Sequence, residues 1–539
     1  MHLNNSELKD GAKWEKAGIR LPAFDRDKMI AETVKEPVWV HFGAGNIFRA
    51  FPAALQQELL ERGLSRKGIV AAEGYDGEII DRVYRPHDNL SLLVTLKSDG
   101  TIGKAVIGSI AEALRADRPR EKEFERLREI FRCDSLQMAS FTITEKGYRL
   151  TRGDGEPFPD VAADFAEGPS NPQSYMGKVA SLCYERYLHG AKPLALVSMD
   201  NCSRNGARLS EAVLAFARKW GENGKAEKGF ASYLEDPERI SFPWSMIDKI
   251  TPRPDDDVRK MLEASGFEDT AGEITAKKTY VAPFVNAEET QYLVVEDRFP
   301  GGRPPLEKAG VIFTDRATVE KAEKMKVGTC LNPLHTALAV FGCLLGYTKI
   351  SDEMKDEDLV QLVRGIGYRE GLPAVVDPGI ISPKAFLDEF IGVRLPNPFL
   401  PDTPQRIATD TSQKIPVRFG ETIKAYLSSD RLSVGDLKLI PFTLAGWCRY
   451  LMGIDDGGRP FSPSPDPMLP ELTATLSGVR LGQTGPFHSV LQPILSRKEI
   501  FGTDLYETEL GKTAEADFAE LVSGKGAVRA ALKKHTAGV

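Results

Sequence analysis

The stretch EPVWVHFGAGNIFRAFPAALQQELLERGL, residues 36–64, decides the fold of the N-terminal half of the chain. Its residues 38–42 form an apolar run that predicts a buried strand, and residues 48–62 have the periodicity of a helix that Gly63 ends. A glycine-rich turn, GAG at residues 43–45, joins the two. This is the place where a dinucleotide-binding βα unit carries its fingerprint.

Further apolar runs follow this unit, with charged helical segments between them, at residues 68–73, 136–144 and 193–200. Strands that alternate with helices predict a parallel sheet wound by crossovers. Pro and Gly then cluster at residues 297–310, which is typical of a domain junction. Beyond it the pattern is mostly helical. We therefore expect a Rossmann-type α/β domain with an N-terminal extension over residues 1–305 and a mainly helical substrate and catalytic domain over residues 306–539.

Composition excludes several classes of protein. The chain has 539 residues, 42% of them hydrophobic and 27% charged, which rules out a disordered chain, a collagen-like repeat and a small disulfide scaffold. The formal charge of -7 gives no basic surface for nonspecific binding of nucleic acid. A small-molecule substrate is therefore expected, and the sequence implies no particular oligomeric state.

The cysteines and the apolar segments predict where the protein works. The six cysteines form no CxxC pair, and together with the seven histidines they have no metal-binding spacing, so we expect no metal site. The N-terminus lacks the apolar core of a signal peptide. The longest apolar stretch, residues 336–347, is shorter than the ~20 residues of a membrane span. A cytoplasmic location without a membrane partner is expected.

The GAG turn predicts a site for NAD. Its first glycine permits the tight turn, and the second lets backbone N–H groups approach the pyrophosphate. Phe48 replaces the third glycine of the usual pattern, and an ordinary strand–helix turn is the alternative. Glu73 ends the next strand and would hold the ribose hydroxyls, which favours NAD over NADP, with Asp76 as a rival. The expected cofactor-binding residues are Gly43, Ala44, Gly45, Asn46, Ile47, Phe48, Arg49 (as a possible phosphate contact) and Glu73.

A second set of candidates lies just beyond the junction, in EKMKVGTCLNPLHTALAVFG, residues 323–342. A buried Lys326 would suit the base that removes a hydroxyl proton while hydride leaves. The Asn332 amide can donate to a developing oxyanion, and His335 can orient a substrate. Simpler interpretations exist: Asn332 before Pro333 is a good helix N-cap, and the other two can be ordinary helical residues.

Further polar residues lie at the end of a predicted strand, where α/β enzymes bind ligands, or in loops. Such loops are more often turns and caps than binding sites, and basic residues are usually solvated. The polar residues are Asp200, Asn201 and Asn205 in VSMDNCSRNG, Asp248 and Lys249 in FPWSMIDKITP, and Arg406, Lys414 and Arg418 in RIATDTSQKIPVRF.

Taken together, seven blocks in order along the chain resemble the polyol-specific long-chain dehydrogenases, the family of mannitol 2-dehydrogenase, fructuronate reductase (D-mannonate oxidoreductase) and tagaturonate reductase. The blocks are VHFGAGNIFRAF, FTITEKGY, SMDNCSRNG, SMIDKITP, EDRFPGGRPPLEKAGV, KMKVGTCLNPLH and RIATDTSQKIPVR. The resemblance implies metal-independent, NAD(P)-dependent oxidation of a secondary alcohol. It also implies an active site in a cleft between a Rossmann-type domain and a helical domain.

The resemblance also implies roles for individual residues. Lys326 would be the general base, Asn201 and Asn332 would stabilise the oxyanion, and His335 would touch the substrate. Glu323 would relay the proton towards solvent. Asp248, Arg406 and Lys414 would line the distal part of the substrate site.

The sequence departs from the family pattern at one point. Five residues separate Lys326 from Asn332, whereas the family motif has four. In an unbroken helix, at 100° per residue, Asn332 would lie about 120° from Lys326, and Lys324 would converge with it better. We predict an irregularity between Val327 and Pro333, either a π-bulge or a helix break, and keep Lys326 as the base. The changed motif suggests a divergent branch of the family.

Arg406, Lys414 and Arg418 are cations that can bind a carboxylate, but the mannitol enzymes are expected to share part of this set, so the cations do not decide the substrate. The low hydrophobicity of the substrate-side loops and the extra length over typical mannitol dehydrogenases favour a sugar acid. The leading hypothesis is interconversion of D-mannonate and D-fructuronate with NAD(H). The alternatives are altronate and tagaturonate, mannitol and fructose, or a catalytically inactive NAD- or sugar-binding regulator on the same scaffold.

Overall fold

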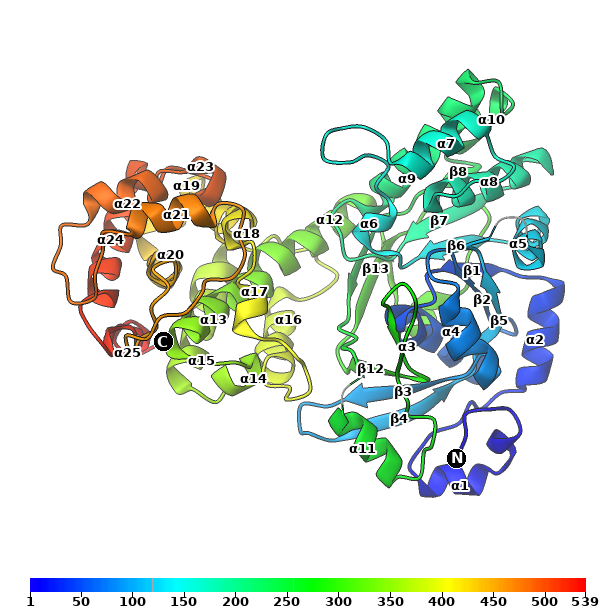
Figure 1. The fold of residues 1–539 in the computed structure, drawn as a ribbon, viewed down its shortest axis with the longest axis horizontal. Coiled ribbons are helices and arrows are strands. Elements are labelled where there is room, and N and C mark those ends of the chain that lie inside the picture. Colours follow the sequence, from blue (N-terminus) through cyan, green and yellow to red (C-terminus); the bar gives the residue numbers. More distant parts are fainter. Residues whose placement is uncertain (119–120, 255) are drawn as a thin grey trace. The chain divides into compact units, whose positions relative to one another are not determined.

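The computed structural model describes residues 1–118, 121–254 and 256–539, and its contacts divide the chain into two compact units (Figure 1). One unit comprises Met1–Lys97 and Thr101–Glu320, and the other comprises Ser98–Gly100 and Lys321–Val539. We call them the Rossmann unit and the helical unit. The division that the sequence predicts, between residues 305 and 306, stays a prediction.

The Rossmann unit is built on a six-stranded sheet in which every neighbouring pair is parallel. The strand order is β5-β2-β1-β6-β7-β8, so the order reverses between β1 and β6. This is the doubly wound arrangement that the alternating pattern predicts, and its ligand sites lie at the carboxyl ends of the strands beside the reversal. The strands are β1 (Trp39–Phe42), β2 (Ile69–Glu73), β5 (Ile110–Arg115), β6 (Met138–Phe141), β7 (Leu194–Ser198) and β8 (Ile240–Ser241).

Apolar side chains bury both faces of this sheet. Val40 and Phe42 of β1 belong to a core shared with α5 (Lys122–Arg132), α8 (Tyr175–Leu188) and α9 (Asn205–Glu222). Trp39 belongs to a second core, because successive side chains of a strand point to opposite faces. Near-continuous apolar runs are typical of parallel strands that are covered on both sides.

Smaller sheets extend the Rossmann unit. One has the order β12-β3-β4 and another the order β14-β13-β9. Their strands are β3 (Ser91–Leu96), β4 (Ile102–Ile107), β9 (Ser245–Asp248), β12 (Phe284–Glu288), β13 (Tyr292–Glu296) and β14 (Ile312–Thr314).

The helix expected at residues 48–62 is two helices, α3 (Asn46–Ala50) and α4 (Pro52–Glu61). Phe51 breaks them with φ −128° and ψ −73°. The cause is Pro52, which disfavours helical backbone at the residue before it and begins the new helix without an N–H to donate.

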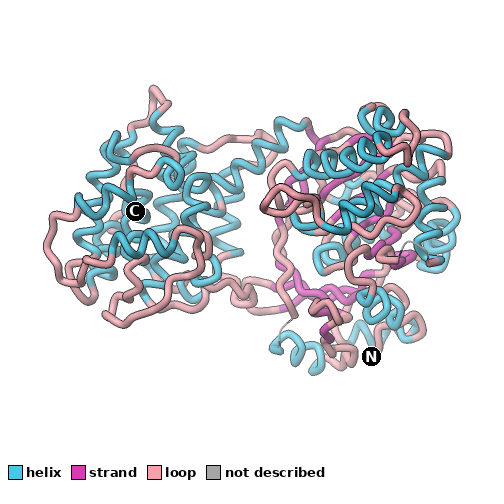
Figure 2. Tube along the Cα trace, turned by 45° about the horizontal axis from the view of Figure 1, so that its top comes forward, coloured by secondary structure: helices cyan, strands magenta, loops and turns pink. Residues whose placement is uncertain are grey.

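The helical unit has helices and loops but no strand among its described residues (Figure 2). Two helices form its centre, since nearly every residue of α13 (Asn332–Leu345) and all of α20 (Leu439–Tyr450) are buried. Further helices pack on them: α14 (Ile350–Glu353), α15 (Glu357–Arg364), α24 (Glu509–Leu521) and α25 (Ala527–Thr536). The helix α12 (Arg316–Met325) precedes them in the chain and spans the division between the two units.

One helical stretch among the described residues, Arg316–Leu345, is long and apolar enough to cross a membrane. Most of it is buried inside the protein, as is usual for a core helix that is hydrophobic all round.

Candidate active site

The glycine-rich turn joins β1 to α3 at the reversal of strand order. Gly43 has φ +102°, and a Cβ there would lie 2.3 Å from the carbonyl oxygen of Thr142, the residue after β6. Both the backbone conformation and the close approach to Thr142 therefore require glycine. A hydrogen bond from Gly43 N–H to the Ala72 carbonyl at 2.9 Å fixes the turn against β2.

The residues after Gly43 form a backbone surface suited to an anion. Among the described residues, no acceptor is found for the N–H groups of Gly45, Asn46, Ile47 and Phe48. A Cβ added at Gly45 would meet no atom within 4 Å, so the space above the turn is open. Four unused donors beside open space at the start of a helix fit the pyrophosphate of NAD.

Phe48 explains how the turn works without a third glycine. Its ring is buried and stacks on His41 of β1, with ring centroids 4.2 Å apart. His41 contacts Ser140 Oγ and Thr142 Oγ1 on the neighbouring β6 segment, and burial lowers its pKa to about 3. A neutral, fixed imidazole thus replaces the close helix–strand packing that glycine usually permits.

Arg49 faces the protein interior. Its guanidinium is 2% exposed and donates to the Ala282 carbonyl at 2.8 Å and to Asn46 Oδ1 at 2.8 Å. These bonds anchor α3 to the segment before β12. The phosphate contact expected from the sequence is therefore not supported, because the charged group is engaged on the side away from solvent.

Glu73, at the end of β2, holds the turn itself. Its Oε2 accepts the Ala44 N–H at 2.9 Å, and its Oε1 accepts the N–H groups of Tyr75 and Asp76 at 2.8 and 3.0 Å. Burial raises the pKa of this carboxyl, and the three N–H bonds oppose that shift. Asp76 is buried and accepts from Thr275, so it is the weaker candidate for a ribose contact.

Two residues that follow β7, one in the loop and one at the start of α9, serve the fold. Asp200 accepts the Tyr148 hydroxyl at 2.6 Å and the N–H groups of Ile143 and Thr144, and so fixes the loop after β6. Asn205 bridges this loop to β9 through Ser245. Asn201, between them, is exposed, and Asp248 is the buried last residue of β9.

The helical unit contains the irregularity that the motif spacing predicts. Residues Lys326–Cys330 form a π-helical turn, and the Leu331 N–H donates to the Lys326 carbonyl at 3.1 Å, five residues back. Leu331 then leaves helical geometry with φ −126°, and α13 begins at Asn332. The wider turn and the break absorb the extra residue, so the prediction of an irregularity is confirmed.

The two candidate lysines differ sharply in burial. Lys326 is 3% exposed, whereas Lys324, on the last turn of α12, is exposed to solvent. A lysine that acts as a base needs a desolvated position, since solvent keeps its ammonium form stable. Burial therefore favours Lys326 over Lys324. Glu323 is partly exposed, as a relay to solvent would require.

Asn332 and His335 lie on the first turn of α13. No hydrogen bond of the Asn332 side chain is found within the described part of the chain, and the residue does not cap the helix. The His335 ring packs edge-on against Phe390, and its Nε2 lies 3.8 Å from the Asp402 carboxylate. This carboxylate also pairs with Arg406. Asp402 was missed by sequence reasoning, although its i,i+4 spacing to Arg406 was available as a signal.

Lys414 and Arg418 complete a basic cluster on the helical unit. Lys414 Nζ donates to the carbonyls of Ile407 and Thr409. Its pKa is lowered by burial and by the charges of Arg418 and Arg406. Arg418 donates to Thr336 Oγ1 at 2.6 Å, on the helix that carries Asn332 and His335. The cluster of Arg406, Lys414 and Arg418 is a set of cations suited to an anionic substrate.

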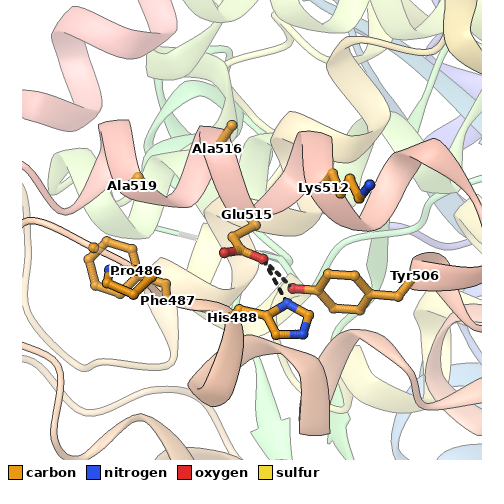
Figure 3. A pocket seen from close by; sticks show the side chains of 9 residues that line it. Pro486, Phe487, His488, Tyr506, Lys512, Glu515, Ala516 and Ala519 are labelled. Atoms are coloured by element: carbon orange, nitrogen blue, oxygen red, sulfur yellow. Dashed lines mark hydrogen bonds and ion pairs between the residues drawn. The ribbon is translucent and has the colours of Figure 1, made fainter.

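A separate hollow of about 430 Å³ on the helical unit contains none of these residues (Figure 3). Its one carboxylate, Glu515, accepts the Tyr506 hydroxyl at 2.8 Å and contacts His488 Nδ1 at 3.2 Å. We assign no chemistry to it. No group of three or more His, Cys, Asp or Glu residues that could hold a metal ion occurs among the described residues.

Comparisons with known proteins agree with a Rossmann-type N-terminal part and a helical C-terminal part. The mannitol dehydrogenase Rossmann domain matches residues 38–308, and the mannitol dehydrogenase C-terminal domain matches residues 318–522. D-mannonate oxidoreductase of Thermotoga maritima is 54% identical over 99% of both chains.

Two solved structures share the fold over the whole chain. A substrate-free D-sorbitol dehydrogenase has a TM-score of 0.80 at 25% identity and covers 99% of this chain and all of its own. Mannitol 2-dehydrogenase of Pseudomonas fluorescens, in a ternary complex with NAD and D-mannitol, has a TM-score of 0.70 at 26% identity and covers all of both chains.

Proposed function

The chain belongs to the mannitol dehydrogenase family, and we propose that it interconverts D-mannonate and D-fructuronate. It is an NAD-dependent oxidoreductase of the alcohol dehydrogenase type that acts on a polyol or sugar acid. The observation that carries the choice of substrate is the full-length 54% identity with the D-mannonate oxidoreductase. The cationic cluster on the helical unit supports it, because a sugar acid brings a carboxylate that a neutral polyol lacks.

NAD supplies the hydride acceptor for oxidation and, as NADH, the donor for reduction. The backbone donors of residues 45–48 and the Glu73 carboxylate are proposed to hold it. Support comes from the open space at Gly45 and from the three N–H bonds that fix Glu73 beside the turn. We propose that the protein residues which hold it are Gly43, Ala44, Gly45, Asn46, Ile47, Phe48 and Glu73.

Proton transfer is assigned to Lys326. During oxidation its neutral amine takes the proton of the substrate hydroxyl, and during reduction its ammonium returns one to the carbonyl oxygen. Its burial at 3% exposure supports the role, because the amine lies inside the protein rather than in bulk solvent. Glu323 is proposed to pass that proton to solvent.

The oxygen that gains or loses charge needs hydrogen-bond donors. We assign this task to the amides of Asn332 and Asn201, since an amide N–H can stabilise an oxyanion without giving up a proton. His335, oriented by Asp402 and Phe390, is proposed to contact the substrate. Asp248, Arg406 and Lys414 are proposed to line the distal part of the substrate site.

The experiment is a comparison of initial rates of NADH oxidation with D-fructuronate, D-tagaturonate and D-fructose as substrates. We expect the highest kcat/KM with D-fructuronate and a lower kcat/KM with NADPH than with NADH. A higher kcat/KM with D-tagaturonate or D-fructose would identify that compound, instead of D-fructuronate, as the substrate. Tight NADH binding without turnover of any of them would favour the inactive regulator.

We also propose that the enzyme works in the cytoplasm on a small-molecule substrate, without a nucleic acid or membrane partner. All six cysteines are free, which suits a reducing compartment. Fractionation of cells that produce the protein checks this, and recovery of the activity in the membrane or secreted fraction would contradict it.

A further inference from the structure

Arg418 is a partly buried cation that has no counter-charge among the described residues. It lies in the π-helical turn Pro416–Gly420, and burial lowers the pKa of its guanidinium to about 10. Among the described residues, no carboxylate pairs with it, and its one hydrogen bond runs from Nη1 to Thr336 Oγ1. A desolvated charge without a partner is costly, so such an arrangement points to an anion that completes it.

The neighbouring cations are satisfied differently. Arg406 pairs with the Asp402 carboxylate, and Lys414 donates to two main-chain carbonyls. Asp410 also acts on Lys414, but more weakly than Arg418 does, and Asp466 is bound to Ser412. Among the described residues, Arg418 is therefore the cation of this cluster that hydrogen-bonds to neither a carboxylate nor a main-chain carbonyl.

Lys414 and Arg418 also repel each other. They are four residues apart, a spacing at which like charges destabilise a helix, and the charge of Arg418 lowers the pKa of Lys414. An anion between them would remove this repulsion. A single carboxylate is the right size for the task, because it can accept hydrogen bonds on both oxygens.

The position of Arg418 connects it to the proposed reacting groups. Thr336, which holds its guanidinium, directly follows His335 on α13, and Thr336 Oγ1 in turn donates to the Asn332 carbonyl at 3.1 Å. The π-helical turn of Arg418 packs against the one that begins at Lys326. Thr422, in the helix α19 (Glu421–Leu427) that follows, donates through its Oγ1 to the Gly328 carbonyl. One group of packed helices thus carries the proposed base and Arg418.

We propose that Arg418 binds the carboxylate of the sugar-acid substrate and so selects acids over neutral polyols and ketoses. The inference rests on the proposed function, because it presupposes a substrate with a carboxylate. Thr336 holds one nitrogen of the guanidinium, and the remaining nitrogens present a paired donor edge that a planar carboxylate can meet in a bidentate way. Thr336 is a positioning residue for Arg418.

The test measures kcat and KM for D-fructuronate and for D-fructose with NADH, in the wild type and in Arg418→Gln. We expect the KM for D-fructuronate to rise on the order of 100-fold, as for loss of one partner of a desolvated charge pair. The KM for D-fructose and the Kd for NADH should stay within threefold of the wild type. Arg418→Lys should recover part of the loss, because it restores the charge but not the fork.

Two further variants separate binding from folding. Thr336→Val keeps the shape but removes the hydroxyl that holds Arg418, so we expect a smaller rise in the same KM, roughly tenfold, with an unchanged melting temperature. Arg431→Gln, at an exposed position, is the matched control and should leave kcat and KM unchanged for both substrates. If Arg418→Gln does not fold, Arg418→Lys and Thr336→Val decide the outcome.

The outcomes distinguish the two proposals. A wild type that reduces D-fructuronate efficiently, combined with Arg418 variants that keep its KM within threefold, overturns the role of Arg418 and leaves the proposed function intact. A wild type that reduces D-fructose but not D-fructuronate overturns both.

Discussion

The Ala44 N–H donates to Glu73 Oε2 at 2.9 Å and so links the turn after β1 to the end of β2. The acid that sequence patterns place on the ribose is at the same time the residue that fixes the turn proposed to hold the pyrophosphate. The proposed ribose contact and the fixed turn depend on the same carboxylate. A substitution of Glu73 should therefore change the affinity for the cofactor and the local stability together.

Replacement of Glu73 by Gln should therefore weaken NADH binding and lower the melting temperature. The carboxylate accepts three N–H bonds, one at Oε2 and two at Oε1. The amide nitrogen of Gln cannot accept a hydrogen bond, so at least one of these three bonds is lost. We expect a Kd for NADH raised about tenfold or more, measured by fluorescence titration. Glu58→Gln, at an exposed position of α4, is the control. An unchanged Kd would remove Glu73 from the cofactor site.

The two glycines of the turn should respond differently to Ala. At Gly43 a Cβ would collide with Thr142 and φ is +102°, so Gly43→Ala should lower the melting temperature and impair NADH binding. At Gly45 a Cβ meets no protein atom and φ is −80°, so Gly45→Ala should fold like the wild type.

The Gly45→Ala variant should nevertheless bind NADH about 10- to 100-fold more weakly, because the added methyl group fills space proposed for the pyrophosphate. Thermal melting and NADH titration of both variants check this. Normal NADH affinity of Gly45→Ala would show that the pyrophosphate does not pass over this position.

Lys326→Ala should reduce kcat at least 100-fold while the Kd for NADH stays close to that of the wild type, since a general base contributes 10²–10⁴-fold. Lys324→Ala, two residues away and exposed, should keep its activity. Stopped-flow or steady-state rates of NADH oxidation measure both. A wild-type kcat in Lys326→Ala, or loss of activity in Lys324→Ala alone, would reverse the assignment of the base.

Glu353 should make stability depend on pH. Both of its carboxyl oxygens are buried without a hydrogen-bond partner among the described residues, next to Gly342 of α13. Burial, with a smaller contribution from Asp356, raises its pKa to about 9. The folded protein therefore keeps a proton that the unfolded chain releases above pH 4.5. Between these values the free energy of unfolding should fall by roughly 1 kcal/mol per pH unit from this group.

Glu353→Gln removes that titration but keeps the shape of the side chain. The melting temperature of the variant should exceed that of the wild type by an increasing margin from pH 5 to pH 9. Glu357→Gln, at an exposed position nearby, should show no such trend. Melting temperatures of Glu353→Gln and wild type that stay parallel over this range would mean that the carboxyl is solvated in solution.

Local sequence patterns were enough to predict much of this protein. Apolar runs and turns predict the parallel sheet and put the GAG turn at the carboxyl end of β1, because strand burial and backbone turns depend on neighbouring residues. The single extra residue between Lys326 and Asn332 predicted a helix irregularity, since helical geometry fixes the direction of each side chain. Pro52 is an equally local signal, and it divides α3 from α4.

The partners of the charged side chains were decided only by the tertiary structure. Arg49 is held by a carbonyl 233 residues away in sequence, and Asp402 meets His335 from a loop outside α13. The same holds for Arg418, which contacts Thr336 across 82 residues of sequence. The residues near Arg418 in the sequence do not reveal that, in the described part of the structure, no carboxylate pairs with it. Sequence spacing determines which way a side chain points within its own element. Packing of distant elements determines whether its charge is already neutralised, and therefore whether it remains available for a ligand.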